Sequence, residues 1–498
     1  MSAPGAPKGF AGPWCWALST LCGVVAGVVV AVTVPAEEHA IPLWLCIPFG
    51  ALLLSIAGMP LLRPKFWHDH FPDFAFFLGA LVLGYYLVAM GGHGRHEMLH
   101  AGVEYYSFIA LVGGLYVASG GILVDIRRRA TPGRNTLLLG AGAVIANLLG
   151  TTGASVLLIR PFMRMNRGRL RPIHVVFFIL IVSNCGGCLT PIGDPPLYLG
   201  YLKGVPFFWT LTHLWPMWLV VNGVLLGAFF AVDARMPRVG GVEVAPHTSA
   251  RERTAVVSPS ASMVCLLLLV AGVLIDPALK NYAGVEGYPI GATFQLVMAV
   301  LAYVLADPDV RRANRFTFEP VKEVGFLFAG IFLTMAPALG YLRQHAADLG
   351  LTTPTQYYFA TGGLSAVLDN APTYLSFLQV GLGTLHIPMS SAGIAGFIAG
   401  TFELTNEAGR AVRFEGQTLL EGISLGAVFF GAMTYIGNGP NFMVKSIVDA
   451  AHAESGEAEG SAGHEAMGTR MPSFFGYVLY ALAILAPVLV VNWLVFIR

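Results

Sequence analysis

The stretch Thr190-Pro-Ile-Gly-Asp-Pro-Pro196 decides the fold, because it closes an apolar run that would otherwise form a continuous membrane helix. Proline removes a backbone N–H and clashes with the preceding turn, and glycine tolerates the distorted backbone that results. We therefore expect the helix to unwind near Asp194. In hydrocarbon, unwound backbone is tolerated only where it lines a protein-buried or water-filled cavity, so the break predicts a site for a small ion or solute.

A second copy of this pattern, Thr434-Tyr-Ile-Gly-Asn-Gly-Pro440, again places Ile-Gly before a carboxylate or carboxamide and then a proline. Other segments form pairs in the same order along the chain: 43–62 with 260–275, 74–90 with 289–306, 105–124 with 323–342, and the polar tip Thr151–Ser155 with Asp369–Thr373. Because five crossings separate equivalent helices, the second copy is predicted to be upside down. Inverted repeats are typical of secondary transporters, whose site lies between the repeats near the bilayer midplane.

The composition is that of a polytopic membrane protein, and we predict an all-α fold. Of 498 residues, 55% are hydrophobic and 11% are charged, whereas soluble domains carry about 25% charged residues. The apolar runs approach the roughly 20 residues that cross a bilayer as a helix. We predict about eleven crossings, at 14–34, 43–62, 74–90, 105–124, 174–193, 215–234, 260–275, 289–306, 323–342, 421–450 and 472–496. The first is interpreted as a retained helix, because about 21 apolar residues exceed the length of a signal-peptide core.

Two further apolar segments, 136–163 and 355–381, are predicted to be re-entrant hairpins rather than crossings. Arginines flank both ends of the first, among them Arg134 and Arg164, and positive charge is retained on the cytoplasmic side. Both ends should therefore be cytoplasmic, with the chain turning back near Gly150. When the hairpins are not counted as crossings, most basic residues fall in cytoplasmic loops. This predicts a multi-pass protein of the inner (plasma) membrane with a cytoplasmic N-terminus.

The hairpin tips and the helix breaks supply the polar groups of the predicted site, because freed carbonyls and side-chain oxygens are ligands for a hard cation such as Na⁺. We predict that the cation or substrate is bound by Asn147, Thr151, Thr152 and Ser155; by Ser183, Asn184, Thr190 and Asp194; by Asp369, Asn370 and Thr373; and by Thr434, Asn438 and Asn441. We expect two pseudo-symmetric sites, each made by one tip and one break. The serines and threonines have an alternative role, in which their hydroxyls only form hydrogen bonds between packed helices and bind no ion.

Asp194 and Asp369 are the only acidic residues deep in these motifs. Carboxylates within membrane segments are rare and costly, which favours a functional role. A carboxylate that binds either a proton or Na⁺ is the simplest device for exchanging one for the other. Both residues are therefore predicted to couple proton movement, and their substitution by asparagine should remove that coupling.

Three other features allow a functional and a structural interpretation. Arg160 is expected to reach the cytoplasmic surface or pair with an acid, and an anion clamp is the alternative. Cys185-Gly-Gly-Cys188 has redox or zinc spacing but no second pair, so all six cysteines are expected to be thiols. His96, Glu97 and His100 fit a zinc-protease pattern, which makes a membrane metalloprotease the remote alternative; we expect instead a polar outer loop at 91–104 and no zinc site.

Three motifs span the hairpins and the first break: Gly150-Thr-Thr-Gly-Ala-Ser-Val-Leu-Leu-Ile-Arg-Pro161, Ser183-Asn-Cys-Gly-Gly-Cys-Leu-Thr-Pro-Ile-Gly-Asp-Pro-Pro196 and Leu368-Asp-Asn-Ala-Pro-Thr373. Together they resemble the ion transporter superfamily, and within it the NhaD-type sodium/proton antiporters and the citrate transporters grouped with them. The resemblance covers nearly the whole chain. It implies a homodimer that works as an elevator, in which a transport domain carrying the hairpins and broken helices slides across the membrane against a scaffold domain.

This resemblance implies scaffold helices at 1–135, a first transport half at 136–235, a cytoplasmic linker at 236–258, a second scaffold half at 259–350 and a second transport half at 351–498. It also implies that the tips Thr151–Ser155 and Asp369–Thr373 ligate the ion. Dicarboxylate members carry Ser-Asn-Thr at both tips, whereas the tips here read Thr-Thr-Gly and Asp-Asn-Ala. This difference favours exchange of a cation for a proton over transport of an organic anion.

The sequence thus predicts a secondary active transporter and not an enzyme. The first expectation is Na⁺ (or Li⁺)/H⁺ antiport without a resident cofactor, and the alternative is Na⁺- or H⁺-coupled symport of citrate or a dicarboxylate. The expected partners are the lipid bilayer, a small ion or carboxylate solute, and a second copy of the chain. A net charge of +1, without a basic aromatic patch, gives no indication of nucleic-acid binding.

Overall fold

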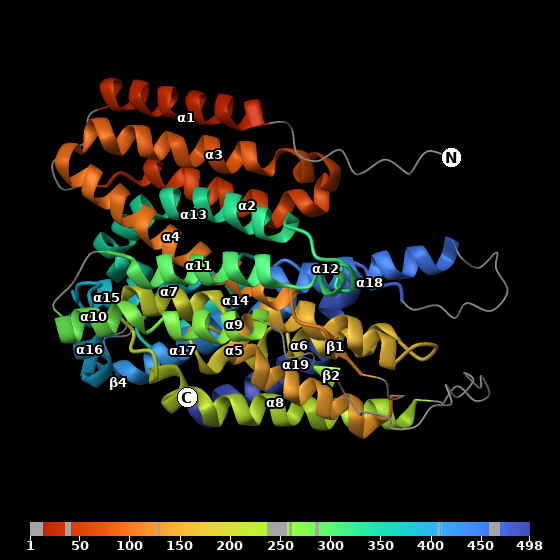
Figure 1. Ribbon diagram of the computed structural model, residues 1–498. Helices are drawn as coiled ribbons and strands as arrows, with labels where there is room; N and C mark the ends of the chain where they lie inside the picture. Colours follow the sequence, from red (N-terminus) through yellow and green to blue (C-terminus); the bar gives the residue numbers. More distant parts are fainter. Residues whose placement is uncertain are drawn as a thin grey trace.

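Helices dominate the computed structural model, which describes residues 13–34, 41–126, 130–236, 256–257, 261–283, 288–405, 409, 411–457 and 469–498. Most of the long helices lie side by side (Figure 1). The predicted linker 236–258 falls outside the described residues, except for 236 and 256–257. All six cysteines are free, as predicted.

One group of helices comes from the N-terminal part of the chain and from its middle. These elements are α1 (Pro13–Thr33), the 3-10 helix η1 (Leu43–Cys46), α2 (Ile47–Leu62), α3 (Pro64–Ala89), α4 (Gly91–Gly120), α9 (Ala261–Gly272), α10 (Ile275–Ala283), α11 (Ile290–Leu305), α12 (Pro308–Ala313) and α13 (Glu319–Gln344). They pack mainly on one another, with α3 between α1 and α13 and with α4 against α9 and α11.

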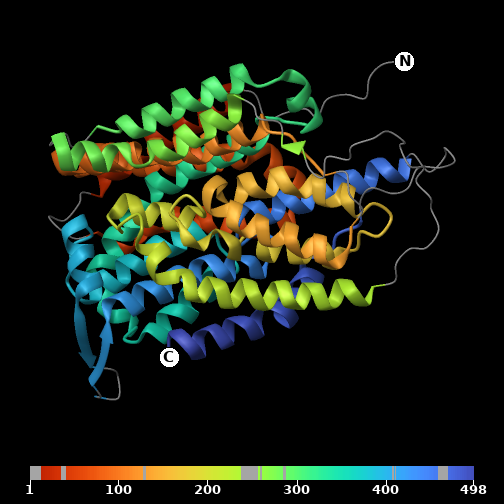
Figure 2. The ribbon, with the colours of Figure 1, turned by 60° about the horizontal axis from the view of Figure 1, so that its bottom comes forward.

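A second group contains both predicted hairpins and both predicted breaks. Its elements are α5 (Pro132–Met165), α6 (Pro172–Ile181), η2 (Cys185–Leu189), α7 (Pro195–Lys203), α8 (Trp209–Arg235), η3 (Ala346–Leu349), α14 (Pro354–Ser365), α15 (Asn370–Thr384), α16 (Ser391–Ala399), α17 (Gly416–Phe430), η4 (Gly431–Met433), α18 (Gly439–Glu457) and α19 (Phe474–Phe496). Figure 2 shows these yellow and blue helices below the red and green ones of the first group. The groups touch chiefly where α4 meets α5 and where α13 meets α15.

Local sequence signals set several helix starts. Helices α3, α5, α6, α7 and α14 carry proline in their first turn, where its missing N–H costs no hydrogen bond. Thr131 and Thr353 cap α5 and α14 by accepting from the N–H groups of Arg134 and Gln356. The prolines that punctuate the sequence therefore begin helices as well as break them.

Two small antiparallel sheets accompany the helices, and the all-α prediction did not include them. Strand β1 (Val124–Asp125) pairs with β2 (Val256–Val257), and β3 (Thr401–Thr405) forms a hairpin with β4 (Ala411–Glu415). In the part of the chain that the structure describes, each sheet has two strands and leaves the helical architecture unchanged.

Within the described residues, nine helices are long and apolar enough to cross a membrane, and two shorter apolar ones are α9 and α11. This confirms a multi-pass membrane protein. The predicted loop at 91–104 is wrong, because α4 is helical from Gly91 onwards. Histidine and glutamate one turn apart, His93 with Glu97 and His100 with Glu104, form pairs that support helix in this polar stretch.

Both predicted hairpin segments fold back on themselves. In α5 the chain turns back at Gly150, whose φ of 72° suits glycine. The two ends of the segment meet, because Asn135 Nδ2 donates to Asn166 Oδ1 at 2.8 Å. These residues would lie about 45 Å apart in a straight helix. In the second segment, a side-chain carbon on Gly381 would lie 3.7 Å from the ring of Tyr357. We call α5 the first hairpin and α14 with α15 the second hairpin; their re-entry from one side of a membrane stays a prediction.

Candidate functional site

The first break lies between α6 and α7, where residues 182–194 leave the α-helix. Its backbone finds partners on the first hairpin: Thr151 N donates to Gly193 O at 2.8 Å, and Leu189 N donates to Asn147 Oδ1 at 2.8 Å. Asn147 Nδ2 donates in turn to Gly186 O at 2.7 Å. The amide of Asn147 therefore holds the break in place, and both of its polar atoms already have partners.

Helix α8 also holds this break through two residues that the sequence reasoning did not single out. Trp218 Nε1 donates to Gly186 O at 2.8 Å, and Asn222 Nδ2 donates to Cys185 O at 3.2 Å. Their signal in the sequence is weak, because polar side chains such as asparagine also form plain hydrogen bonds between packed membrane helices.

The second break lies between α17 and α18 and is built like the first. Thr190 Oγ1 donates to Asn147 O at 2.5 Å and accepts from Gly193 N at 3.1 Å. Thr434 Oγ1 donates to Ala366 O at 2.6 Å and accepts from Gly437 N at 3.1 Å. In each break a threonine hydroxyl thus ties the unwound chain to its own hairpin.

Both hairpins and both breaks meet at the carboxylate of Asp194. Its Oδ1 accepts from Thr151 Oγ1 at 2.8 Å and from Asn438 Nδ2 at 3.1 Å, and its Oδ2 accepts from Asn370 Nδ2 at 2.8 Å. Asp194 is 1% exposed, and all three donors are neutral and buried. The two sites expected from the sequence are therefore joined at one carboxylate.

A chain of amides continues from this carboxylate towards the second break. Asn438 Nδ2 donates to Asn184 Oδ1 at 3.0 Å, and Asn184 Nδ2 donates to Asn441 Oδ1 at 2.5 Å. Asn441 Nδ2 reaches Gly431 O and Thr434 O, both at 2.9 Å. Three of the predicted residues, Asn184, Asn438 and Asn441, thus form one buried polar path.

The other predicted residues surround this cluster without touching Asp194. Ser155 and Ser183 share a hydroxyl contact of 2.7 Å, and Thr373 Oγ1 donates to Asp369 O at 2.8 Å. Asp369 is half-buried and caps α15, because its Oδ1 accepts from Ala371 N at 3.0 Å. Its side chain has this local structural role whether or not it also binds a cation.

A small cavity of about 20 Å³ adjoins Asp194. Thr151 and Thr152 of the first hairpin and Leu111 and Leu115 of α4 are among the residues that line it. A space of this size accommodates one water or one small cation. Thr152 is thereby placed beside the same space as Asp194.

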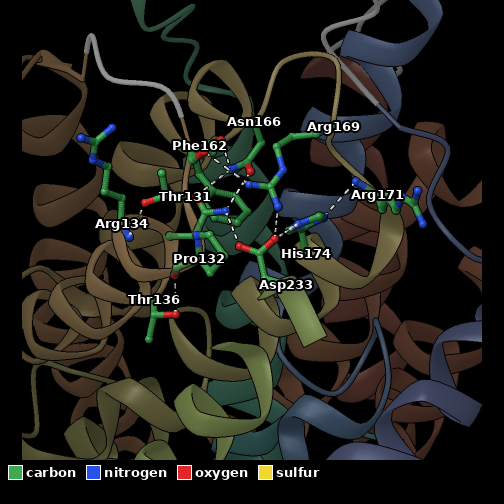
Figure 3. A network of polar contacts seen from close by, with 12 residues as sticks. Thr131, Pro132, Arg134, Thr136, Phe162, Asn166, Arg169, Arg171, His174 and Asp233 are labelled. Atoms are coloured by element: carbon green, nitrogen blue, oxygen red, sulfur yellow. Dashed lines mark hydrogen bonds and ion pairs between the residues drawn. The ribbon is translucent and has the colours of Figure 1, made fainter. Parts of the chain in front are cut away.

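The base of the first hairpin is anchored by a buried polar network (Figure 3). Arg169 and His174 both bind Asp233 of α8, with His174 Nε2 3.1 Å from Asp233 Oδ1. Asn135 Nδ2 donates to Asp233 Oδ2 at 2.9 Å and to Asn166 at the other end of the hairpin. The network fixes both ends of the hairpin to α8 and so sets the position of its tip. It was not predicted, because Asp233 resembles an ordinary charge at the end of a membrane helix.

The zinc-protease pattern and Arg160 lie apart from the Asp194 cluster. His96, Glu97 and His100 lie on α4, and the described residues contain no group of three or more histidine, cysteine or acidic side chains that could hold a metal ion. Arg160 is half-buried in α5, near Tyr116 of α4.

Close glycine packing inside the second break gives a direct test of its geometry. A Cβ on Gly437 would lie 2.7 Å from both Gly431 O and Ser365 O, whereas a Cβ on Gly439 would meet nothing within 4 Å. Gly437→Ala is therefore expected to lower the free energy of unfolding by about 1 to 3 kcal/mol, as overpacking does. Thermal unfolding in detergent would show this, with Gly439→Ala as the matched control that leaves stability unchanged or slightly raised. Equal stability of the two variants would contradict the tight packing.

Comparison with protein families gives a match that covers nearly the whole chain. Residues 38–497 match the family described as "Putative citrate transport". A search of curated proteins gives no match. Because the family is one of transporters, the chain is a transporter and not an enzyme. With buried breaks and folded-back hairpins meeting at one carboxylate, and with a family match over residues 38–497, the chain belongs to this citrate transporter-like family.

Proposed function

We propose that the protein is a Na⁺ (or Li⁺)/H⁺ antiporter of the inner membrane, in which Asp194 binds the cation and the proton in turn. The observation that carries the proposal is the convergence of both hairpins and both breaks on this carboxylate. The three groups bonded to it, on Thr151, Asn370 and Asn438, are neutral. They stabilise the carboxylate without cancelling its charge, so a cation or a proton is the partner that would neutralise it.

The size of the site supports a small ion as the cargo at Asp194. The adjoining cavity of about 20 Å³ has room for one small cation and none for a tricarboxylate. In this proposal Asp194 and Asp369 both couple proton movement, with Asp194 at the centre of the site and Asp369 beside the cluster. No resident cofactor is needed, because Na⁺ or Li⁺ and H⁺ are the transported ions.

The proposed movement is that of an elevator working between two inverted repeats. The group that contains α5–α8 and α14–α19 would carry the site, and the group that contains α1–α4 and α9–α13 would form the scaffold of a homodimer. Support comes from the two breaks, whose threonines Thr190 and Thr434 make matching hydrogen bonds to their own break and to its hairpin. A cytoplasmic N-terminus and re-entrant hairpins complete the proposal.

Cross-linking the two groups is expected to stop transport. A Cβ on Gly153 of the first hairpin would lie 3.8 Å from Ser119 Cβ on α4, which matches the mean Cβ separation in disulfides. The double variant Ser119→Cys/Gly153→Cys should form a disulfide on oxidation, lose ion flux in vesicles and regain it on reduction. Each single variant under the same oxidant is the control. Full flux in the oxidised, cross-linked protein would contradict the elevator.

The function itself is tested in vesicles that contain the purified protein and a pH-sensitive dye. Separate additions of Na⁺, Li⁺, K⁺ and citrate distinguish the cargo. We expect Na⁺ and Li⁺ to drive proton movement, and citrate alone to drive none. A dye response to citrate and not to Na⁺ or Li⁺ would overturn antiport.

That outcome would favour the second candidate, symport of citrate or a similar carboxylate with Na⁺ or H⁺. Its support is the family description, which names citrate. In this case Asp194 would hold the coupling cation, and the anion would need another place to bind.

A further inference from the structure

Helix α7 carries Asp194 at one end and a lysine at the other. Asp194 is its N-cap, and Lys203 is its last residue, about 14 Å further along the helix axis. The helix packs on α15 and α17 of its own group. The fit on that side is tight, because a side-chain carbon on Gly200 would overlap the ring of Tyr374 in α15. Helix α7 therefore connects Asp194 rigidly to Lys203 within the second group of helices.

An ion pair joins the far end of α7 to the first group of helices. Lys203 Nζ contacts both carboxylate oxygens of Glu104 on α4, at 2.7 and 2.8 Å. The two side chains are only 15% and 10% exposed, so water screens their attraction less than that of a surface pair. Other ion pairs, such as that of Lys445 with Asp449, lie within one helix. The pair of Lys203 with Glu104 is different because it bridges the two groups.

Two tyrosine hydroxyls reinforce this bridge from the same helix. Tyr198 Oη donates to Ser107 O of α4 at 3.2 Å. Tyr201 Oη donates to Val273 O, directly after α9, at 2.8 Å. These bonds, like the ion pair, run from α7 to elements of the first group. A displacement of α7 along the first group would break them together with the ion pair.

The surroundings of the ion pair allow it to open without stranding a buried charge. His100 Nδ1 lies 3.2 Å from the same carboxylate of Glu104, and both residues belong to α4. His100 would therefore stay beside Glu104 if Lys203 moved away. Lys203 and Glu104 also line a pocket of about 920 Å³ between α3, α4, α7, α13 and α15, which gives the lysine side chain room to move. Removing one partner of a buried pair is costly only where the other stays without compensation.

We propose that the ion pair of Lys203 with Glu104 is a latch, which holds the group carrying Asp194 against the scaffold and opens each time this group moves. The inference rests on the elevator movement of the proposed function and adds the contact that restrains it. Because α7 is rigid, a displacement of Asp194 also displaces Lys203 from Glu104. A contact made in one of two states shifts the populations towards that state. The latch therefore keeps the displaced state rare.

The test measures how often the two groups separate, by means of a thiol placed far from the latch. Ser119 of α4 is 1% exposed, and a Cβ on Gly153 of the first hairpin would lie 3.8 Å from its Cβ. It lies about 22 Å along α4 from Glu104, so a local disturbance at the latch does not expose it. Every variant carries Ser119→Cys. Alkylation of the introduced thiol by N-ethylmaleimide is followed by peptide mass spectrometry, which separates it from the six native cysteines.

Lys203→Met and Glu104→Gln are each expected to speed this alkylation at least about threefold, as the loss of an ion pair does to a two-state population. The double variant Glu104→Lys/Lys203→Glu restores a pair with the charges exchanged, and should react as slowly as Ser119→Cys alone. Lys445→Met is the matched control, because Lys445 Nζ binds Asp449 Oδ2 at 2.7 Å inside α18 and joins no two groups. Melting temperatures in detergent show that each variant is folded.

Two results would overturn the latch: Lys203→Met and Glu104→Gln that react as slowly as Ser119→Cys alone, or an exchanged-charge variant that reacts as fast as they do. Equal acceleration by Lys445→Met would do so as well. Na⁺/H⁺ exchange in vesicles, measured on the same preparations, keeps the test separate from the proposed function. Faster alkylation of Lys203→Met in a protein without exchange would support the latch and remove the antiport. Unchanged alkylation in a protein that exchanges Na⁺ for H⁺ would do the reverse.

Discussion

Asp194→Asn is expected to reduce Na⁺-driven proton flux to the level of protein-free vesicles. Asparagine has nearly the same shape but cannot bind a proton or neutralise a cation. It also replaces one acceptor oxygen with an NH₂ group. Because Asn370 and Asn438 both donate towards this side chain, one of these donors would lose its acceptor. The measurement is dye response to a Na⁺ pulse at matched protein density. Wild-type flux in the purified variant would refute the role of Asp194.

The variant to compare with it is Asp369→Asn, which removes the other predicted coupling carboxylate while keeping the fold. Asp369 caps α15 by accepting from Ala371 N at 3.0 Å, and asparagine caps helices about as well as aspartate does. Any loss of flux therefore reports the charge and not an unfolded helix end. We expect a loss of coupling here too, but a smaller one, because no hydrogen bond among the residues that the structure describes joins Asp369 to the Asp194 cluster.

The helix breaks could be predicted because their causes are local. Proline and glycine act on the turn in which they lie, and α7 and α18 indeed begin at Pro195 and Gly439. The fold-back of α5 at Gly150 also follows from one residue with a positive φ. Such features need no knowledge of the rest of the chain.

The assembly of the site could not be predicted, because it depends on tertiary packing. Asn370 and Asp194 are 176 residues apart in sequence, and no spacing rule indicates that they form a hydrogen bond. For this reason two separate sites were expected, where the structure joins them. Asn147 looked like a ligand, since its residue type is right, but its amide is used by the backbone of the break.

The loop expected at 91–104 shows a different limit. The sequence predicts a polar outer loop there, whereas the segment forms the first turns of α4, in which His100 pairs with Glu104 one turn away. The anchor at Asp233 was missed as well, because its partners are 59 to 98 residues away along the chain.

Asp233→Leu is expected to lower the free energy of unfolding by about 3 to 5 kcal/mol, the cost of removing one partner from a buried ion pair. Asp233 is 1% exposed, and Arg169 is largely buried beside it. The substitution leaves Arg169 without its anion and Asn135 without one acceptor. Thermal unfolding in detergent measures the loss, and the exposed pair Arg312–Asp309 provides the control, since Asp309→Ala should change stability by at most about 1 kcal/mol.

The double variant Asp233→Leu/Arg169→Met separates the ion pair from the other contacts of the network. Removing both charges of a buried pair is often neutral, whereas removing one strands the other. We therefore expect the double variant to regain part of the stability that Asp233→Leu loses. The remaining loss would reflect Asn135 and His174, which keep no carboxylate to bind. A double variant no more stable than Asp233→Leu would mean that Arg169 contributes nothing, and that the hairpin base is held by its amides alone.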